Sequence, residues 1–154
     1  MVYSRIMIAD QWCKTSWRAR PGSFVSLMTL YESNFVRLGW LAADLRAVTA
    51  HGVSRTAADC DLHLIPLDIA RYTSVFRLTY EFESEGAVIR DPDLEVRVYH
   101  DARLAEACSF RGFRRHPQLA RIESRLKREL DQRWARNMML NKWLEYCADR
   151  GHQF

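Results

Sequence analysis

The 154-residue chain of 18.1 kDa has the length of one ordinary domain. Its 48% hydrophobic and 12% aromatic residues, with six Gly and four Pro, exclude a disordered or collagen-like chain, and no apolar run approaches the ~20 residues that span a bilayer. Residues 59–102 carry four basic and ten acidic side chains, whereas residues 103–154 carry twelve basic and six acidic ones. We therefore expect a soluble globular protein with an acidic middle and a basic C-terminal part.

The four cysteines, Cys13, Cys60, Cys108 and Cys147, are widely separated in the chain. They form no Cys-x-x-Cys pair, so neither a zinc ribbon nor a thioredoxin-like motif is indicated. The apolar run at residues 6–9 is shorter than the apolar segment of a secretory signal. We therefore expect four reduced thiols, a cytoplasmic location and no contact with a membrane.

The N-terminal part of the chain predicts a tail followed by one helix. Residues 1–22 show no sustained period and end in a turn-forming Arg-Pro-Gly, so we expect a tail before a single domain over residues 23–151. Ser23 is a good N-cap, and apolar residues recur at steps of three and four from Phe24 to Leu45. Asn34 lies on this apolar stripe, and we interpret it as structural because buried Asn side chains usually satisfy backbone groups. Residues 46–59 lose the period and predict a loop.

Alternating apolar and polar residues predict four strands in the middle of the chain. They start at Cys60, Tyr72, Leu94 and Leu104. The second strand extends to Phe82, and residues 83–93 predict a loop. Residues 100–103 have the length and composition of a hairpin loop, which pairs residue 97 with 106 and residue 95 with 108. In this register Val96 and Val98 point inward and Arg97 points outward.

The C-terminal part predicts a helical region that starts near Pro117, is broken near residues 129–131 and stops at Gly151. We interpret its aromatic and methionine residues mainly as core, although part of their broad apolar face could form a homodimer or partner surface. These residues are Trp134, Met138, Met139, Trp143 and Tyr146. The predicted order is α-β-β-β-β-α. This is an α+β fold in which an N-terminal helix and a C-terminal helical region flank a four-stranded, mainly antiparallel sheet.

Four stretches carry a resemblance to a known family. YESNF (31–35), ARYT (70–73), VRVYHDARLAEAC (96–108) and NKWLEYC (141–147) are similar to the YqiB-like family of small bacterial proteins of unknown function. The Tyr-His-Asp-Ala hairpin followed by Ala-Glu is the most specific of them. The resemblance covers residues 24–45, 60–109 and 130–151, and it implies no activity. The chain departs from the family at residues 110–129, where arginines replace an acidic and Lys-containing segment.

A basic stripe in this arginine-rich segment is the first candidate site. Arg121, Arg125 and Arg128 share one face of the predicted helix, and Arg114 and Arg115 come just before it. Such a stripe can contact the phosphates of nucleic acid or an acidic partner. The alternative is a solvated helix face, because Glu123 precedes Lys127 by four residues, which is the helix-stabilising order.

A ligand site on the polar face of the sheet is the second candidate, formed by Arg71, Arg97, Tyr99, His100 and Glu106. An arginine beside a tyrosine can hold the carboxylate or phosphate of a small nucleotide-like anion. The alternative is that Arg97 and Glu106 form only a cross-strand ion pair.

Metal-ligand residue types are present but not at metal-binding spacing. His63, His100, Asp101 and Glu106 are of the types that ligate metals or transfer protons, yet the chain has no pair such as His-x-x-x-His. It also has neither Gly-x-Ser-x-Gly nor a phosphate-binding loop. We therefore expect no metal, no cofactor and no catalytic residue. The sequence favours a non-enzymatic binding or regulatory protein, and the alternative is an enzyme or sensor for a small nucleotide-like anion.

Overall fold

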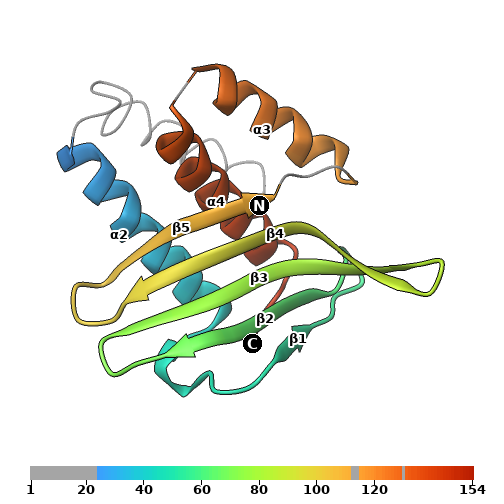
Figure 1. The fold of residues 1–154 in the computed structure, drawn as a ribbon, viewed down its shortest axis with the longest axis horizontal. Coiled ribbons are helices and arrows are strands. Elements are labelled where there is room, and N and C mark those ends of the chain that lie inside the picture. The colour runs from blue at the N-terminus through green and yellow to red at the C-terminus, as the bar shows by residue number, and fades with distance from the viewer. Residues whose placement is uncertain (1–23, 112–114, 130) are drawn as a thin grey trace.

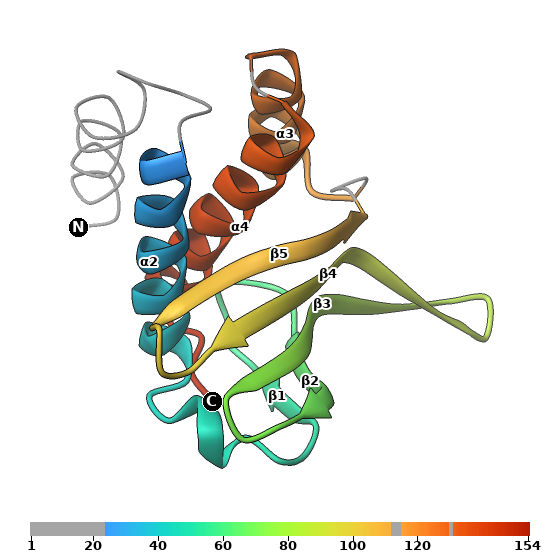
Figure 2. The same ribbon diagram turned by 60° about the vertical axis from the view of Figure 1, so that its left-hand side comes forward.

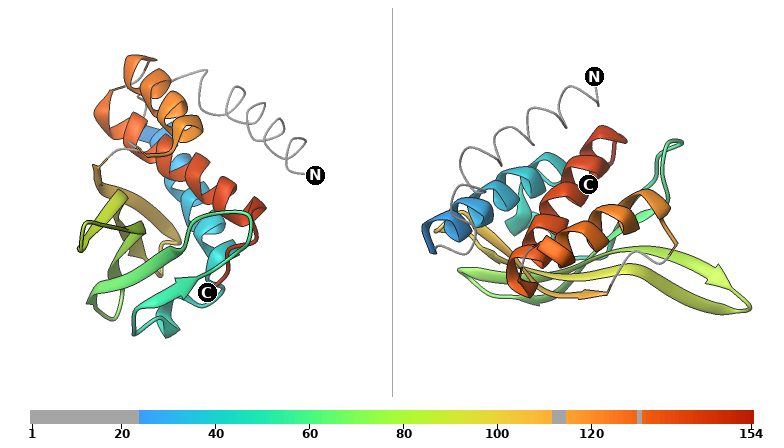
Figure 3. Two further views of the ribbon diagram at one scale, coloured as in Figure 1. Left: turned by 90° about the vertical axis from the view of Figure 1, so that its right-hand side faces the viewer. Right: turned by 90° about the horizontal axis from the view of Figure 1, so that it is seen from above.

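The computed structural model describes residues 24–111, 115–129 and 131–154 (Figure 1). In chain order they form α2 (Phe24–Leu41), the 3-10 helix η2 (Leu45–Ala47), β1 (Gly52–Ser54), β2 (Leu62–Ile69), β3 (Thr73–Ser84), β4 (Ala87–Tyr99), β5 (Leu104–Arg111), α3 (Pro117–Glu129) and α4 (Gln132–Asp149). The strands form one antiparallel sheet in the order β1-β2-β3-β4-β5. Helices α2 and α4 pack on one face of this sheet, and no helix among the described residues covers the other face (Figures 2 and 3).

The α+β class is confirmed, but the prediction of four strands is wrong, because the sheet has five. The additional strand, β1, lies in residues 46–59, where the sequence predicts a loop. It has only three residues and starts with a glycine, so it is too short to show an alternating pattern. It forms because the edge of β2 pairs with it, with Val53 opposite His63.

The loop predicted for residues 83–93 is also wrong, because β3 and β4 continue through it as a long hairpin. The turn consists of Glu85 and Gly86, which have φ angles of 51° and 78°, as a two-residue hairpin turn of primed type requires. This end of the hairpin projects beyond the helices (Figure 1), and its Val88 side chain is 59% exposed. Both faces of the projecting strands therefore meet solvent, and the one-sided apolar alternation that identifies a strand is missing.

The hairpin between β4 and β5 has the predicted loop at residues 100–103. Tyr99 pairs with Leu104, and Arg97 pairs with Glu106, as expected. Val96 and Val98 are at most 1% exposed, which confirms that they face the core. The predicted pairing of residues 95 and 108 is wrong: Glu95 pairs with Ser109, because the register shifts between residues 95 and 96.

Helix α2 is shorter than its apolar stripe predicts. It ends at Leu41, and Leu45 contributes to the core from the separate helix η2. Tyr72, at which the alternating pattern predicts the second strand to start, precedes β3 and is 53% exposed. Thr79 is fully buried at a bulge in β3, where its hydroxyl donates to the carbonyl of Pro92 at 2.6 Å.

Polar side chains join α2, α4 and β5 inside the core. The Asn34 amide donates to the carbonyl of Ala105 at 3.3 Å, and its oxygen accepts from Asn141 at 3.0 Å. Nearby, Arg37 and Glu145 form an ion pair of 3.0 Å, with side chains 7% and 2% exposed. The interpretation of Asn34 as structural is confirmed, because it bonds to a buried backbone carbonyl of β5, an edge strand that no further strand pairs with in the described residues.

The C-terminal helical region follows the prediction closely. Helix α3 begins at Pro117, and α4 begins after Asp131, whose carboxylate caps the new helix by accepting from the Trp134 amide at 3.0 Å. Gly151 has a φ of 88°, as expected for a helix-stopping glycine. The core interpretation is confirmed for Trp134, Met138, Met139 and Trp143, which are at most 4% exposed. A homodimer stays a prediction.

Three of the four cysteines lie in the described residues, and Cys60, Cys108 and Cys147 are free thiols. Cys13, the proposed tail and the Ser23 N-cap lie outside the described residues.

Candidate functional site

The predicted basic stripe lies on the outer face of α3. Arg121, Arg125 and Arg128 are all exposed, while Leu119 and Leu126 on the opposite face are at most 3% exposed. Among the side chains that the structure describes, no carboxylate forms an ion pair with any of the three arginines. Lys127 on the same helix differs, because its Nζ lies 2.8 Å from an oxygen of Glu123.

The two other arginines of the predicted stripe precede α3. Arg115 is exposed, and its guanidinium lies over the ring of Phe82 at 5.9 Å from the centroid. Arg114 lies outside the described residues. The structure thus places four of the five predicted basic residues on or next to one exposed helix.

The predicted ligand site on the sheet is only partly assembled. Arg97, Tyr99 and Glu106 lie together on the uncovered face, where the Tyr99 hydroxyl donates to Glu106 at 2.6 Å. A hydrogen bond with Tyr99 raises the pKa of Arg97. Burial, together with the negative charge of Glu106, raises the pKa of Tyr31 to about 12. Glu106 is therefore held by tyrosines from β4 and α2.

The other two residues of that predicted site lie elsewhere. His100 lies in the turn after β4, where it is buried and its Nε2 lies 2.8 Å from the hydroxyl of Ser74. Ser74 pairs with Val98, which faces the core, so His100 is directed away from the uncovered face that carries Tyr99. Burial, followed by the positive charge of Arg46, lowers the pKa of His100. Arg71 is exposed, with its guanidinium over the Tyr72 ring at 5.1 Å from the centroid.

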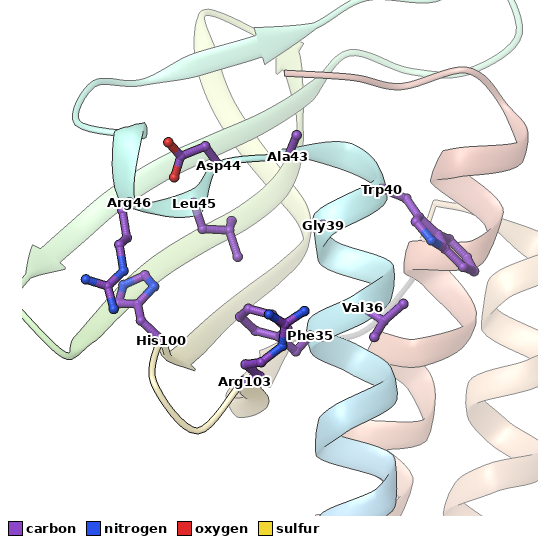
Figure 4. Close-up of a pocket in the computed structure, with 10 residues that line it drawn as sticks. All are labelled: Phe35, Val36, Gly39, Trp40, Ala43, Asp44, Leu45, Arg46, His100 and Arg103. Carbon is purple, nitrogen blue, oxygen red and sulfur yellow. The ribbon is translucent and has the colours of Figure 1, made fainter.

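A pocket of about 440 Å³ lies beside His100, between α2, η2 and the loop from β4 to β5 (Figure 4). Figure 4 shows Arg46 next to the imidazole of His100 and Arg103 next to Phe35. The Arg103 guanidinium lies 5.4 Å from the centroid of the Phe35 ring. Arg46 also forms an ion pair of 2.8 Å with Asp101. Sequence reasoning missed Arg46 because it lies in the predicted loop, where no pattern indicates the direction of a side chain.

A buried polar cluster fixes the end of the chain to the sheet. His152 Nδ1 lies 2.9 Å from the hydroxyl of Ser54, and His152 Nε2 lies 3.0 Å from a carboxylate oxygen of Asp59. Tyr80 donates to the same oxygen at 2.5 Å, and the Ser54 oxygen accepts from the amide of Gln153 at 3.0 Å. Serine, histidine and aspartate are the components of a hydrolytic triad. Here, however, Ser54 is only 5% exposed, and its oxygen accepts a hydrogen bond from the Gln153 amide. We therefore interpret the cluster as structural.

A second polar cluster lies at the surface and contains ligand types that metals prefer. The cluster consists of His51, His63 and Glu81, each of which offers one possible ligand atom. These three atoms all lie within 4.8 Å of one another. Among the described residues, this is the one group of three or more such side chains. Of these three residues, the sequence analysis named only His63 as a possible ligand. Strand pairing, which the local sequence does not reveal, brings the other two to it.

The structure therefore defines a domain with a one-sided antiparallel sheet, a basic outer helix and no helix among the described residues that is long and apolar enough to cross a membrane. The model of a family described as "Protein of unknown function (DUF1249)" matches residues 37–153. The chain is 30% identical over 129 residues to the uncharacterized protein YqiB of Escherichia coli strain K12. The aligned region covers 83% of this chain and 90% of that protein.

The YqiB proteins of Escherichia coli O6:H1 and O157:H7 match to the same extent. No solved structure matches. The chain belongs to the YqiB-like family of proteins of unknown function, DUF1249, which confirms the resemblance seen in the sequence.

Proposed function

We propose that this protein is a non-enzymatic, cytoplasmic binding protein that contacts the phosphate backbone of nucleic acid through Arg121, Arg125 and Arg128. The observation that carries the proposal is that all three guanidiniums are exposed and form no ion pair with the described carboxylates, while Lys127 beside them is paired. Arginine offers a planar fork of donors that matches phosphate oxygens. An arginine that forms no ion pair with a described carboxylate can make such contacts without breaking one of those pairs.

The geometry of α3 supports an extended polyanion as the partner. At 1.5 Å of rise per residue, the three arginines are spaced by about 6 Å and about 4.5 Å along the helix axis. Leu119 and Leu126 anchor the opposite face of the helix in the core, so the stripe is presented on a fixed support.

The same helix is less suited to an acidic protein partner, because protein interfaces have an apolar centre. The large hydrophobic side chains that the structure shows exposed all lie outside α3: Val36, Trp40, Leu67, Ile69, Tyr72 and Val88. Nucleic acid is therefore the partner that the exposed face of α3 favours.

The test is fluorescence anisotropy with a labelled single-stranded RNA and a DNA duplex over a series of salt concentrations. The triple substitution of Arg121, Arg125 and Arg128 to Gln should weaken binding uniformly across sequences and reduce the log–log salt slope on the single strand by about 2. Arg125→Gln and Lys127→Gln form a matched pair, since each removes one positive charge from α3. The first should weaken binding and the second should have a smaller effect; equal effects, or binding that the triple variant retains, would contradict the proposal.

A second candidate function is the recognition of a small nucleotide-like anion at the hairpin between β4 and β5. Its supporting observation is Arg103, a non-glycine residue with a φ of 57°, whose side chain lines the pocket with Arg46 and His100. Strained backbone of this kind is concentrated at functional sites.

A thermal-shift screen with nucleotides and inorganic phosphate tests this candidate. Arg103→Gly keeps the backbone conformation and removes the guanidinium from the pocket, whereas Arg97→Ala removes one from the open face of the sheet. Loss of a ligand-induced shift in the first variant assigns the site to the pocket, and loss in the second assigns it to the sheet face. If no nucleotide or phosphate raises the Tm at millimolar concentration, this candidate is eliminated.

A further inference from the structure

Three side chains from three neighbouring segments meet on the uncovered face of the sheet near its β1 edge. His51 directly precedes β1, His63 lies on β2, and Glu81 lies on β3. Strand pairing places His63 opposite both Val53 and Thr79, which brings the three segments side by side. His51 is exposed, and the side chains of His63 and Glu81 are 11% and 20% exposed.

The distances between the ligand atoms are close to those of a metal site. Nε2 of His51 lies 2.8 Å from Nδ1 of His63, and Oε2 of Glu81 lies 3.8 Å from the other ring nitrogen of His63, Nε2. One of these two His63 nitrogens binds the ion, and each of the three residues offers one ligand atom. Two ligands bound to one zinc ion at about 2.0–2.2 Å are at most about 4.4 Å apart. Since all ligand atoms already lie within 4.8 Å of one another, small side-chain movements close the site, and the exposed ring of His51 is free to make them.

The neighbours of the cluster orient it for binding. Arg90 Nε lies 3.2 Å from Oε1 of Glu81, which leaves the other oxygen directed toward His63. Outer partners of this kind hold the carboxylate ligands of metal sites in place.

We propose that His51, His63 and Glu81 form a binding site for one divalent cation of the zinc class, with the remaining coordination positions open to water. Two imidazoles and a carboxylate suit Zn²⁺ and its transition-metal neighbours, whereas Mg²⁺ and Ca²⁺ prefer all-oxygen ligand sets. The bound ion joins the three-residue strand β1 to β2 and β3.

The proposed site differs from the expectation of no metal drawn from the sequence, which stays untested. That expectation depended on the absence of ligand pairs spaced along one helix or strand, whereas here antiparallel pairing supplies the spacing. The site uses no residue of α3, so it goes beyond the proposed nucleic-acid contact and is independent of it.

Isothermal titration calorimetry of ZnCl₂ into tag-free protein, stripped of metal with a chelator and then dialysed, tests the site. We expect one ion per chain with a Kd of about 10 μM or below, and no comparable heat with Mg²⁺ or Ca²⁺. Zinc at 100 times its Kd should also raise the Tm by about 5 °C or more. Binding weaker than a Kd of about 100 μM would overturn the proposal.

Substitutions then locate the ion. His51→Ala and Glu81→Gln should each weaken zinc binding at least tenfold, because loss of even an outer partner costs about 10–100-fold. The exposed position of His51 allows its variant to fold. Glu83→Gln, on the same strand and exposed, is the matched control and should bind zinc as the unmodified protein does. Cys60→Ser is the control for thiol binding. Zinc binding that survives both ligand substitutions, or is lost with Cys60→Ser, would contradict the assignment.

Discussion

His152 and His63 each lie beside a carboxylate, but the two histidines have opposite surroundings. The side chains of His152 and Asp59 are 0% and 3% exposed and are 3.0 Å apart. The side chains of His63 and Glu81 are 11% and 20% exposed and are 3.8 Å apart. In the first cluster, Ser54 and Tyr80 complete the hydrogen bonding. In the second, His51 and His63 are hydrogen-bonded at 2.8 Å, but His63 and Glu81 are too far apart for a hydrogen bond, and the cluster is open to solvent at His51.

From this comparison we expect the completeness of hydrogen bonding, more than residue type, to separate a structural cluster from a ligand site. A buried network with every group satisfied stabilises a single arrangement of the chain. A cluster with access to solvent and incompletely paired ligand atoms gains more from a cation. The following predictions test each side of this comparison, from the largest expected effect to the smallest.

His152→Ala should have the largest effect on stability. It removes a partner of the buried Asp59 carboxylate and one of the two hydrogen bonds between Ser54 and the chain end. Removing a hydrogen-bond partner of a buried charged group costs about 3 kcal/mol or more of the free energy of unfolding. Urea unfolding followed by circular dichroism measures this loss. A loss below about 1 kcal/mol would show that the cluster does not anchor the chain end.

Tyr80→Phe should have the next largest effect, a loss of about 1–2 kcal/mol in the free energy of unfolding, because it removes a hydrogen bond to a charged group and keeps the ring. The ring stays in place because it packs edge-on against Trp143, at 5.3 Å between centroids. The same urea experiment measures the change. An unchanged free energy of unfolding would mean that Asp59 does not depend on the tyrosine hydroxyl.

Strands that pack against the helices on one face could be predicted from the sequence. Val96 and Val98 alternate with Arg97 and Tyr99 because only one face of β4 meets the core, and the hairpin register followed from that alternation. The projecting end of the β3–β4 hairpin has no such difference between its faces. Strand β1 is too short to show any period, so its existence depends on pairing with β2, which local sequence does not encode.

The candidate sites also differ in whether the sequence alone could predict them. The stripe on α3 depends only on helical spacing, so Arg121, Arg125 and Arg128 emerged on one exposed face as predicted. The metal-ligand cluster depends on the register of three strands, and the His152 cluster depends on where the chain end docks. Both are set by tertiary packing, so no motif along the chain indicated them.

The stability of the protein should fall in acid partly through Asp59. Burial raises the pKa of this carboxyl, but the hydrogen bonds from His152 and Tyr80 outweigh it and hold the pKa below its ordinary value of 3.8. A carboxyl with a lowered pKa stabilises the folded state fully above about pH 4, and this contribution is lost as the pH falls through the folded-state pKa. Urea unfolding between pH 5 and pH 2.5 should therefore show a steeper loss for the unmodified protein than for Asp59→Asn. Equal slopes would show that Asp59 titrates at its ordinary pKa.

His51→Ala should have the smallest effect on the metal-free protein, with a loss below about 1 kcal/mol. The substitution removes a 2.8 Å hydrogen bond to His63, but His51 is exposed, so water can take its place at the His63 ring. The matching measurement is urea unfolding of this variant beside His152→Ala, in the presence of a chelator. Added zinc should then raise the Tm of the unmodified protein and leave that of His51→Ala nearly unchanged. If His51→Ala lost as much free energy of unfolding as His152→Ala, the His51 cluster would be structural. A cluster whose role is to bind a cation should add little to the stability of the metal-free protein.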